Sequence, residues 1–203
     1  MRLQMRNPKS GRYSTVPAKN TLRAFDSFGA SLVKRGKSIL KRYKKVASGT
    51  LIDSYHYKMI PKKDGMELQF GFGEASSYWR FVDEGVKGVG GQIGSGSSRG
   101  TNSPFSFKYD NPGGKLVAAL DSWIRYKNIP LKEGMTQTGL AFAIGYSIKR
   151  RGLERTMFFT RPLEALYQKA QKRVAKAYAD DFQNLLDKMD TVIATLKSDI
   201  SKM

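Results

Sequence analysis

Apolar residues recur at steps of three and four along several stretches of the chain, which is the spacing of helices with one buried face. The first such stretch covers residues 20–46, and Asn20 or Thr21 is the expected cap at its start. Two shorter stretches cover residues 115–127 and 136–151. The pattern therefore predicts one helix near the start of the chain and a pair of helices in its second half.

The last helical stretch is the longest. It begins near Pro162, a residue that a first helical turn tolerates, and continues to Ile200 without an internal glycine or proline. A continuous helix of that length would measure about 58 Å at 1.5 Å per residue. A compact globule of 203 residues is only roughly 40 to 45 Å across. We therefore expect this helix either to break or to project onto a neighbouring molecule.

Residues between the first helix and the middle of the chain favour strands. Residues 50–60 have the composition of a strand, a Pro-Lys-Lys-Asp-Gly turn follows at 61–65, and apolar residues alternate with others over 66–72. This arrangement predicts an antiparallel β-hairpin. Residues 74–83 then predict a short helix that Gly85 ends.

The remaining segments show no period. Residues 85–104 hold seven glycines among serines, which predicts a flexible loop, and residues 1–19 predict a mobile basic arm. We expect an α+β fold: an N-terminal helix, an antiparallel β-hairpin or small sheet, short helices and a long C-terminal helix. The expected organisation is the arm at 1–19, a single domain at 20–189 and a helical tail at 190–203.

Positive charge dominates the chain and is concentrated near its start. Lys and Arg number 36 against 17 Asp and Glu, a formal charge of +19, and residues 1–63 hold sixteen basic residues but only Asp26 and Asp53 as acids. Such a chain repels itself unless an anionic partner screens it. Two interpretations of the basic face of the first helix stay open, an anionic partner or plain solvation. The residues concerned are Lys34, Arg35, Lys37, Lys41, Arg42, Lys44 and Lys45.

The sequence offers little catalytic chemistry. There is no cysteine, and the single histidine, His56, lies in a predicted strand, where we expect it at the surface. Gly36-Lys37-Ser38 imitates a phosphate-binding loop but falls within a helical pattern. Asp83-Glu84 fits a helix terminus better than a metal site, and Asp180-Asp181 fits a solvated helix face. We predict no catalytic residue, no cofactor, no metal and no enzyme, and no segment is apolar enough to suggest a membrane span.

Three segments resemble the phage tail-completion or neck protein family, which comprises minor virion proteins of tailed phages. Residues 78–85 read Tyr-Trp-Arg-Phe-Val-Asp-Glu-Gly, close to the family's aromatic Tyr-x-x-(Phe/Tyr)-Val-(Asp/Glu)-x-Gly segment. Residues 157–165 read Met-Phe-Phe-Thr-Arg-Pro-Leu-Glu-Ala and resemble the segment that starts the family's final helix. Trp123 together with residues 148–152, Ile-Lys-Arg-Arg-Gly, completes the likeness. The order of helix, hairpin, short helix, loop and long helix matches as well.

The resemblance implies a structural virion protein and not an enzyme. Its members build the head–tail connector, so we expect a homo-oligomeric ring that links portal or adaptor to the tail and surrounds the DNA channel. The expected partners are copies of the chain itself, portal, adaptor and tail proteins, and packaged DNA through non-specific contacts. The expected location is the virion's head–tail junction, after assembly in the host cytoplasm. The alternative function is a basic nucleic-acid-binding protein, and a nuclease or cell-wall hydrolase ranks third.

The same segments supply the residues expected in the core or at a subunit seam. We favour the core over the seam for each of them, and we place the last three in the hinge that starts the final helix. They are Tyr78, Trp79, Phe81, Val82, Phe158, Phe159 and Pro162.

Overall fold

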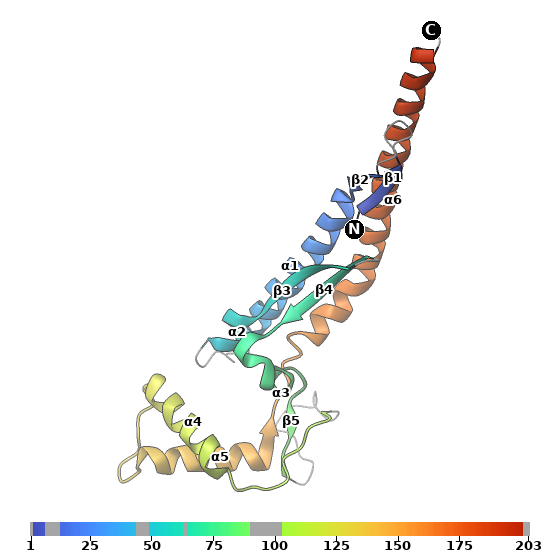
Figure 1. Cartoon of the computed structure of the whole chain (residues 1–203). Coiled ribbons are helices and arrows are strands. Elements are labelled where there is room, and N and C mark those ends of the chain that lie inside the picture. Colours follow the sequence, from blue (N-terminus) through green and yellow to red (C-terminus); the bar gives the residue numbers. More distant parts are fainter. Residues whose placement is uncertain (1, 7–12, 44–48, 63–64, 90–102, 201–203) are drawn as a thin grey trace. The chain divides into compact units, whose positions relative to one another are not determined.

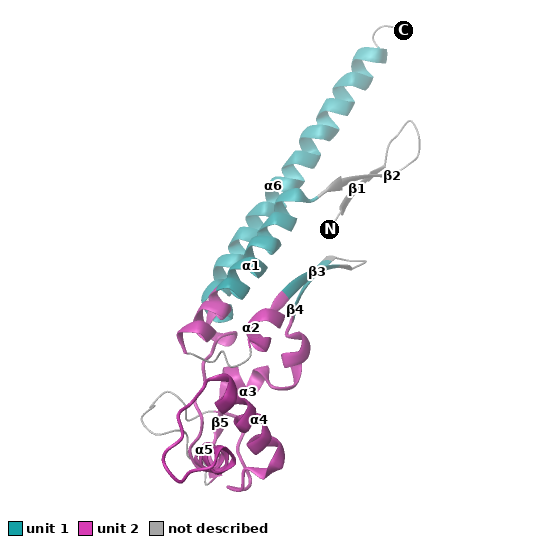
Figure 2. Ribbon diagram, turned by 90° about the vertical axis from the view of Figure 1, so that its left-hand side faces the viewer, with its two compact units in different colours: residues 1–34, 57–70, 163–203 teal, residues 35–56, 71–162 magenta. Residues whose placement is uncertain are grey.

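The computed structural model describes residues 2–6, 13–43, 49–62, 65–89 and 103–200. The chain divides into two compact units, which Figure 2 shows in different colours. Unit 1 contains residues 1–34, 57–70 and 163–203, and unit 2 contains residues 35–56 and 71–162. Helices dominate, and the strands form three separate two-stranded sheets within the described ranges. The α+β class predicted from the sequence is confirmed.

Unit 1 is built on two long helices. The first part of α1 (Lys19–Arg42) lies beside α6 (Thr160–Ile200) in both views (Figures 1 and 2). The predicted hairpin is present as β3 (His56–Lys62) paired with β4 (Gly65–Gly71). α6 is one unbroken helix of 41 residues, about 62 Å at 1.5 Å per residue. The expected break therefore does not occur.

Strand β3 packs closely on α1. A Cβ atom on Gly29 would lie 2.5 Å from the ring of Tyr57, so only glycine allows this approach. The Tyr57 hydroxyl donates a hydrogen bond of 2.7 Å to Asp26 on the same helix, and this bond raises the pKa of the phenol. Phe28 meets Phe70 of β4 edge to face, with the ring centroids 6.4 Å apart. The glycine and the aromatic rings together fix the hairpin on the helix.

A further strand pair occupies the first residues of the chain. β1 (Arg2–Arg6) and β2 (Tyr13–Pro17) are antiparallel, with Arg2 opposite Pro17 and Arg6 opposite Tyr13. The sequence has no hydrophobic period here and predicted a mobile arm. Backbone hydrogen bonds between strands need no apolar alternation, so a pair of this kind leaves little trace in the hydrophobic pattern.

The start of α1 is capped by a carboxylate from α6. Asp181 accepts hydrogen bonds from the Asn20 and Thr21 backbone N–H groups at 3.0 and 2.8 Å, and from the Thr21 hydroxyl at 2.8 Å. Its side chain is buried, whereas Asp180 is exposed. Two expectations are corrected here. Asp181 does not lie on a solvated face, and the first helix begins at Lys19 with a cap supplied from 160 residues away.

Unit 2 consists mainly of short elements. They are α2 (Thr50–Ser54), the 3₁₀ helix η1 (Gly73–Ser77), α3 (Trp79–Glu84), β5 (Val86–Lys87), α4 (Gly113–Tyr126), α5 (Gln137–Arg151) and β6 (Gly152–Leu153). The predicted strand at 50–60 was wrong over residues 50–54. Those residues form a helical turn that buries Leu51 and Ile52. Two adjacent buried residues suit one face of a helix end, and a strand would place them on opposite faces.

Part of the predicted loop at 85–104 is also ordered into a strand. Val86 pairs with Leu153, and Lys87 pairs with Gly152. The rest of that prediction, over residues 90–102, lies outside the described residues.

The helices α4 and α5 form a hairpin. Thr136 caps α5 by accepting a hydrogen bond of 3.1 Å from the Gly139 N–H. A Cβ atom on Gly145 would lie 2.7 Å from the ring of Pro112, and Ala141 is fully buried. Small residues on α5 therefore let the segment before α4 approach closely. The two helices themselves were predicted from the sequence. α5 ends at Arg151, the residue predicted for it.

Replacing Asp181 by alanine is expected to lower the free energy of unfolding by about 1–2 kcal/mol, the usual effect of losing a helix cap. Asp180→Ala removes a neighbouring carboxylate that is exposed, so it serves as the matched control and should leave stability nearly unchanged. Urea denaturation measures both. Equal losses in the two variants would show that the cap contributes nothing specific.

The contribution of Asp181 should also depend on pH. Burial alone would raise the pKa of this carboxyl, but hydrogen bonds from Thr21 and Asn20 outweigh burial and hold the pKa below its usual value. The cap's stabilisation is therefore complete above the unfolded pKa of about 3.9 and is lost as pH falls through the lower folded value. The stability difference between the native chain and Asp181→Ala should shrink in that acidic range.

Candidate functional site

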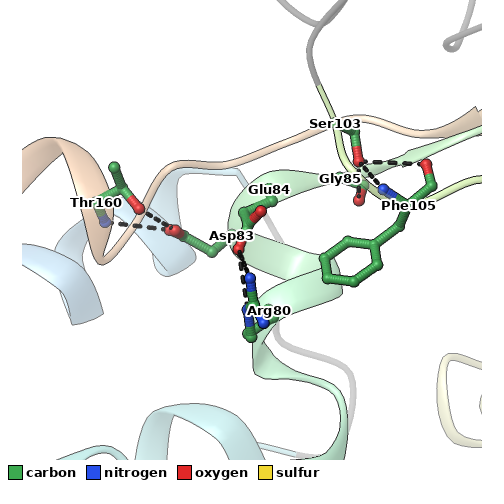
Figure 3. Close-up of polar contacts among 7 residues, drawn as sticks. All are labelled: Arg80, Asp83, Glu84, Gly85, Ser103, Phe105 and Thr160. Atoms are coloured by element: carbon green, nitrogen blue, oxygen red, sulfur yellow. Dashed lines mark hydrogen bonds and ion pairs between the residues drawn. The ribbon is translucent and has the colours of Figure 1, made fainter.

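Two of the three segments that carry the family resemblance meet in unit 2. Asp83, at the end of α3, is 1% exposed and accepts hydrogen bonds from the start of α6. The Phe159 N–H donates at 2.8 Å, the Thr160 N–H at 3.4 Å and the Thr160 hydroxyl at 2.5 Å. In Figure 3, Asp83 points toward Thr160, and the Arg80–Glu84 ion pair lies on the other side of it. The carboxylate therefore caps the last helix; the sequence placed the Asp83-Glu84 pair at a helix terminus but did not indicate this distant partner.

Backbone hydrogen bonds continue this junction. The N–H and the hydroxyl of Thr156 both donate to the carbonyl of Val82, at 3.0 and 2.8 Å, and the Met157 N–H donates to the carbonyl of Asp83 at 2.9 Å. Met157 takes a left-handed conformation, with φ of 50°, which residues other than glycine rarely adopt. The chain therefore turns sharply between its contact with α3 and the first turn of α6.

An aromatic cluster surrounds the junction. Phe72 stacks on Tyr55 with ring centroids 4.9 Å apart and on Trp79 at 4.2 Å, while Phe158 and Phe159 meet Phe72 edge to face. Tyr55, Phe72 and Phe158 are buried. Burial and the charge of Asp83 raise the pKa of Tyr55, so its phenol stays neutral. This cluster is the core of unit 2.

The structure separates the residues that the sequence assigned to core or seam. Phe158 and Pro162 are buried, and Trp79, Val82 and Phe159 are half-buried. Tyr78 and Phe81 are exposed by 36% and 39%. The difference in exposure between Trp79 and Phe81 follows from the turn of the α3 helix. Trp79 points toward Phe72, while Phe81 faces the opposite side, against Phe105.

Phe81 lines an apolar groove of about 660 Å³ within unit 2. Two cations lie over its aromatic walls: Lys149 Nζ is 4.3 Å from the centre of the Phe107 ring, and the Arg80 guanidinium is 5.3 Å from that of Phe105. Ser103 holds the wall by donating to the Gly85 carbonyl at 2.8 Å and accepting from the Phe105 N–H (Figure 3). The apolar lining comprises Phe81, Val86, Pro104, Phe105, Phe107, Leu116, Ile148 and Leu153.

Two glycines allow close backbone contact next to the lining residues Val86 and Leu153. A Cβ atom on Gly88 would lie 1.9 Å from the Arg150 carbonyl oxygen, and one on Gly152 would lie 2.3 Å from the Val86 carbonyl oxygen. Gly152 also takes a φ of 82°, which favours glycine. Backbone therefore touches backbone where β5 meets β6.

A second candidate surface is the basic face of α1. Lys34, Arg35, Lys41 and Arg42 are exposed and Lys37 is half-exposed, and none of these five pairs with a carboxylate in the described part of the chain. Lys44 and Lys45 lie outside the described residues. At 100° per residue, the side chains of Arg23, Lys34, Lys37 and Lys41 leave the helix axis within a sector of about 60°.

Within unit 1, basic residues of α6 lie opposite Arg23 of α1. Arg23 of α1 faces Arg173 and Lys176 of α6 across a hollow of about 270 Å³. Lys169, Lys172, Arg173 and Lys176 are exposed and follow the i, i+3, i+4, i+7 spacing of one helix face. Sequence reasoning had singled out only the α1 residues, although the same spacing was visible in residues 169–176.

The third candidate surface is the apolar stripe of α6. Large apolar side chains stay exposed along this helix, among them Phe182 and Ile193 at 46% and Ile200 at 72%. Leu185, in contrast, is buried. The complete exposed set on this helix is Tyr167, Tyr178, Phe182, Leu186, Met189, Val192, Ile193 and Ile200. Scattered exposed apolar residues are ordinary, but a contiguous row of this size marks an interaction surface.

The residues that the sequence suggested as possible chemical groups can be located in the described part of the chain. The described residues contain no group of three or more histidine or acidic side chains placed to hold a metal ion. His56 lies on the exposed strand surface predicted for it, and its Nδ1 is 2.7 Å from the Ser54 carbonyl oxygen. Gly36-Lys37-Ser38 lies inside α1, where Gly36 packs against Tyr55. No helix in the described ranges is both long and apolar enough to cross a bilayer.

Comparison with known proteins adds no relative. No protein-family model matches the chain, and neither a curated protein nor a solved structure matches it significantly. The geometry of the three surfaces is therefore the basis for inferring a function.

Replacing Asp83 by alanine should remove the acceptor for the Phe159 N–H, the Thr160 N–H and the Thr160 hydroxyl in a partly buried setting and lower the free energy of unfolding by about 1–3 kcal/mol. Asp83→Asn keeps one acceptor oxygen and should fall between the native chain and the alanine variant. Glu84→Ala is the control, because its surface pair with Arg80 is worth about 1 kcal/mol or less. Chemical denaturation of the three variants tests the cap, which is refuted if Asp83→Ala is no worse than Glu84→Ala.

Proposed function

We propose that this chain is a structural virion protein of a tailed bacteriophage that assembles into a homo-oligomeric ring at the head–tail junction. In this role the ring joins portal or adaptor proteins to the tail and encloses the DNA channel. The chain acts by binding copies of itself and other virion proteins, without catalysis.

The exposed apolar stripe of α6 is the observation that carries this proposal. Fully burying one large aliphatic or aromatic side chain contributes roughly 1.5–3 kcal/mol. A set that includes Phe182, Met189, Val192 and Ile193 can therefore offset the entropic cost of association between subunits.

Two further features support the placement in a phage neck. The segments that resemble the neck protein family, at 78–85 and 157–165, meet at Asp83 and form one structural junction. The basic face of α1 is suited to a channel that carries DNA or to an acidic neighbour in the virion. The resemblance is the reason for proposing this family, and the exposed surfaces are the reason for proposing assembly.

The purified full-length chain is expected to form a discrete assembly of several copies. Native mass spectrometry should give one dominant multiple of the subunit mass, and negative-stain electron microscopy should show a ring with a central opening. Purified particles of the virus that carries the gene should contain the chain at the neck. A protein that stays monomeric at every concentration and is missing from particles would rule the proposal out.

A second candidate function is nucleic-acid binding, which the basic face of α1 favours. The cluster of Arg23, Lys34, Lys37 and Lys41 on one side of α1 is suited to a row of phosphates, and within unit 1 Arg173 and Lys176 lie across a hollow from Arg23. A ring around DNA and a free DNA-binding protein would both use such a face. Tight binding of duplex DNA by the dissociated subunit would indicate a free DNA-binding protein, and binding by the assembled ring alone would indicate a ring around DNA.

If this face binds phosphates, Lys37→Glu/Lys41→Glu should weaken duplex DNA binding and lower the slope of log affinity against log salt by about 0.9 for each phosphate that is no longer neutralised. Lys115→Glu/Lys132→Glu changes the net charge equally at exposed positions elsewhere and is the matched control. Fluorescence anisotropy across a salt series measures both. The same weakening in the two variants would indicate a general charge effect and no specific face.

A further inference from the structure

We propose that the C-terminal part of α6, residues 182–200, packs against the same segment of at least two other copies to form a bundle of three or more helices. This inference rests on the proposed function, because it names the segment and the minimum number of copies through which the chain assembles. Its occupant is the chain itself, and the argument comes from the register, the width and the charge of the stripe.

The register of the stripe is that of helices packed side by side. Phe182, Met189 and Leu196 recur every seven residues, and Leu185 and Val192 form a second row three residues later in each repeat. Together they give the alternating three- and four-residue spacing of a helical seam. Phe182, Met189 and Val192 are exposed, whereas the chain's own residues bury Leu185. The seam is therefore open over most of its length.

The stripe is too wide for a pair of helices. Leu186, Ile193 and Ile200 form a third row with a seven-residue period, and all three are exposed. The three rows span roughly 100–120° of the helix circumference at 100° per residue. A two-helix seam covers only the first two rows and would leave the third in water. A third helix covers it, so the pattern indicates more than two copies.

Charge favours the same segment. The chain as a whole carries +19, and copies that approach through their basic faces repel one another. The charged residues within 182–200 are Asp187, Lys188, Asp190, Lys197 and Asp199, which give this segment a net charge of −1. Copies can therefore meet through this segment without strong repulsion.

The chain has no cysteine, so a single introduced thiol reports the contact directly. In a bundle, Val192→Cys places thiols from different copies together, and mild oxidation should produce covalent dimers rapidly. Ala194→Cys lies on the opposite face of the same turn and is the matched control; its cross-linking should be much slower. Circular dichroism of both variants verifies that α6 remains helical.

The third row tests the number of copies. Native mass spectrometry of the unmodified chain should show three or more subunits, and Ile193→Glu/Ile200→Glu should reduce the assembly to dimers or monomers. Asp187→Glu/Asp190→Glu, which leaves the stripe intact, should keep the full assembly. A native chain that stops at dimers, or a third-row variant that assembles fully, would overturn the inferred bundle of three or more.

Two other outcomes separate this inference from the proposed function. If the chain forms a ring but Val192→Cys cross-links no faster than Ala194→Cys, the ring stands and the bundle is wrong, because the subunits meet through other surfaces. If the chain stays monomeric at every concentration, the bundle is wrong, and if it is also missing from purified particles, the proposed function is wrong as well.

Discussion

A buried carboxylate must be paired, and the pairing of Asp83 organises the core of unit 2. A carboxylate with almost no exposure is costly unless hydrogen bonds replace its hydration. Asp83 obtains them from the first turn of α6, where helix N–H groups lack partners within the helix. The buried carboxylate and the unpaired N–H groups of the helix start therefore satisfy each other's need for a hydrogen-bond partner. Because Phe158 and Phe159 are adjacent to those donors, the cap also places the aromatic rings against Tyr55, Phe72 and Trp79.

The same device recurs in unit 1, where Asp181 caps α1. In both cases the start of a long helix is satisfied by a residue distant in sequence, so tertiary contact replaces a local capping residue. α6 takes part both times, once as donor at Thr160 and once as acceptor at Asp181. This helix presents a basic surface over residues 169–176 and an apolar surface over 182–200, and the proposed assembly draws on the apolar one.

Periodicity predicted the parts of this fold that depend on local pattern. The helices α1, α4, α5 and α6, the β3–β4 hairpin and the role of Gly85 after α3 all follow from spacing and turn chemistry. Residues 50–54 were missed, since five residues are too few to distinguish a helical turn from a strand end. The pairings of β1 with β2 and β5 with β6 rest on backbone hydrogen bonds, which no side-chain period records.

The candidate site was predictable only in part. The basic face of α1 was predictable because it is visible in local spacing, whereas the capping of α6 by Asp83 joins residues 76 positions apart and was not. The burial of Asp181 was not predictable either, since an Asp-Asp pair on a helix looks the same whether solvated or used as a distant cap. Likewise, Tyr78 and Trp79 are neighbours of similar character, and only the packing of Phe72 decides which one is covered.

The contact between β5 and β6 limits which substitutions the chain tolerates beside the groove. Gly88 and Gly152 meet neighbouring carbonyl groups more closely than any side chain allows, so even a single methyl group there would force the backbone apart. The side chains that face the groove, such as Leu116 and Phe107, are under no such backbone constraint. Substitutions are therefore expected to alter the lining of the groove more readily than the backbone contact beside it.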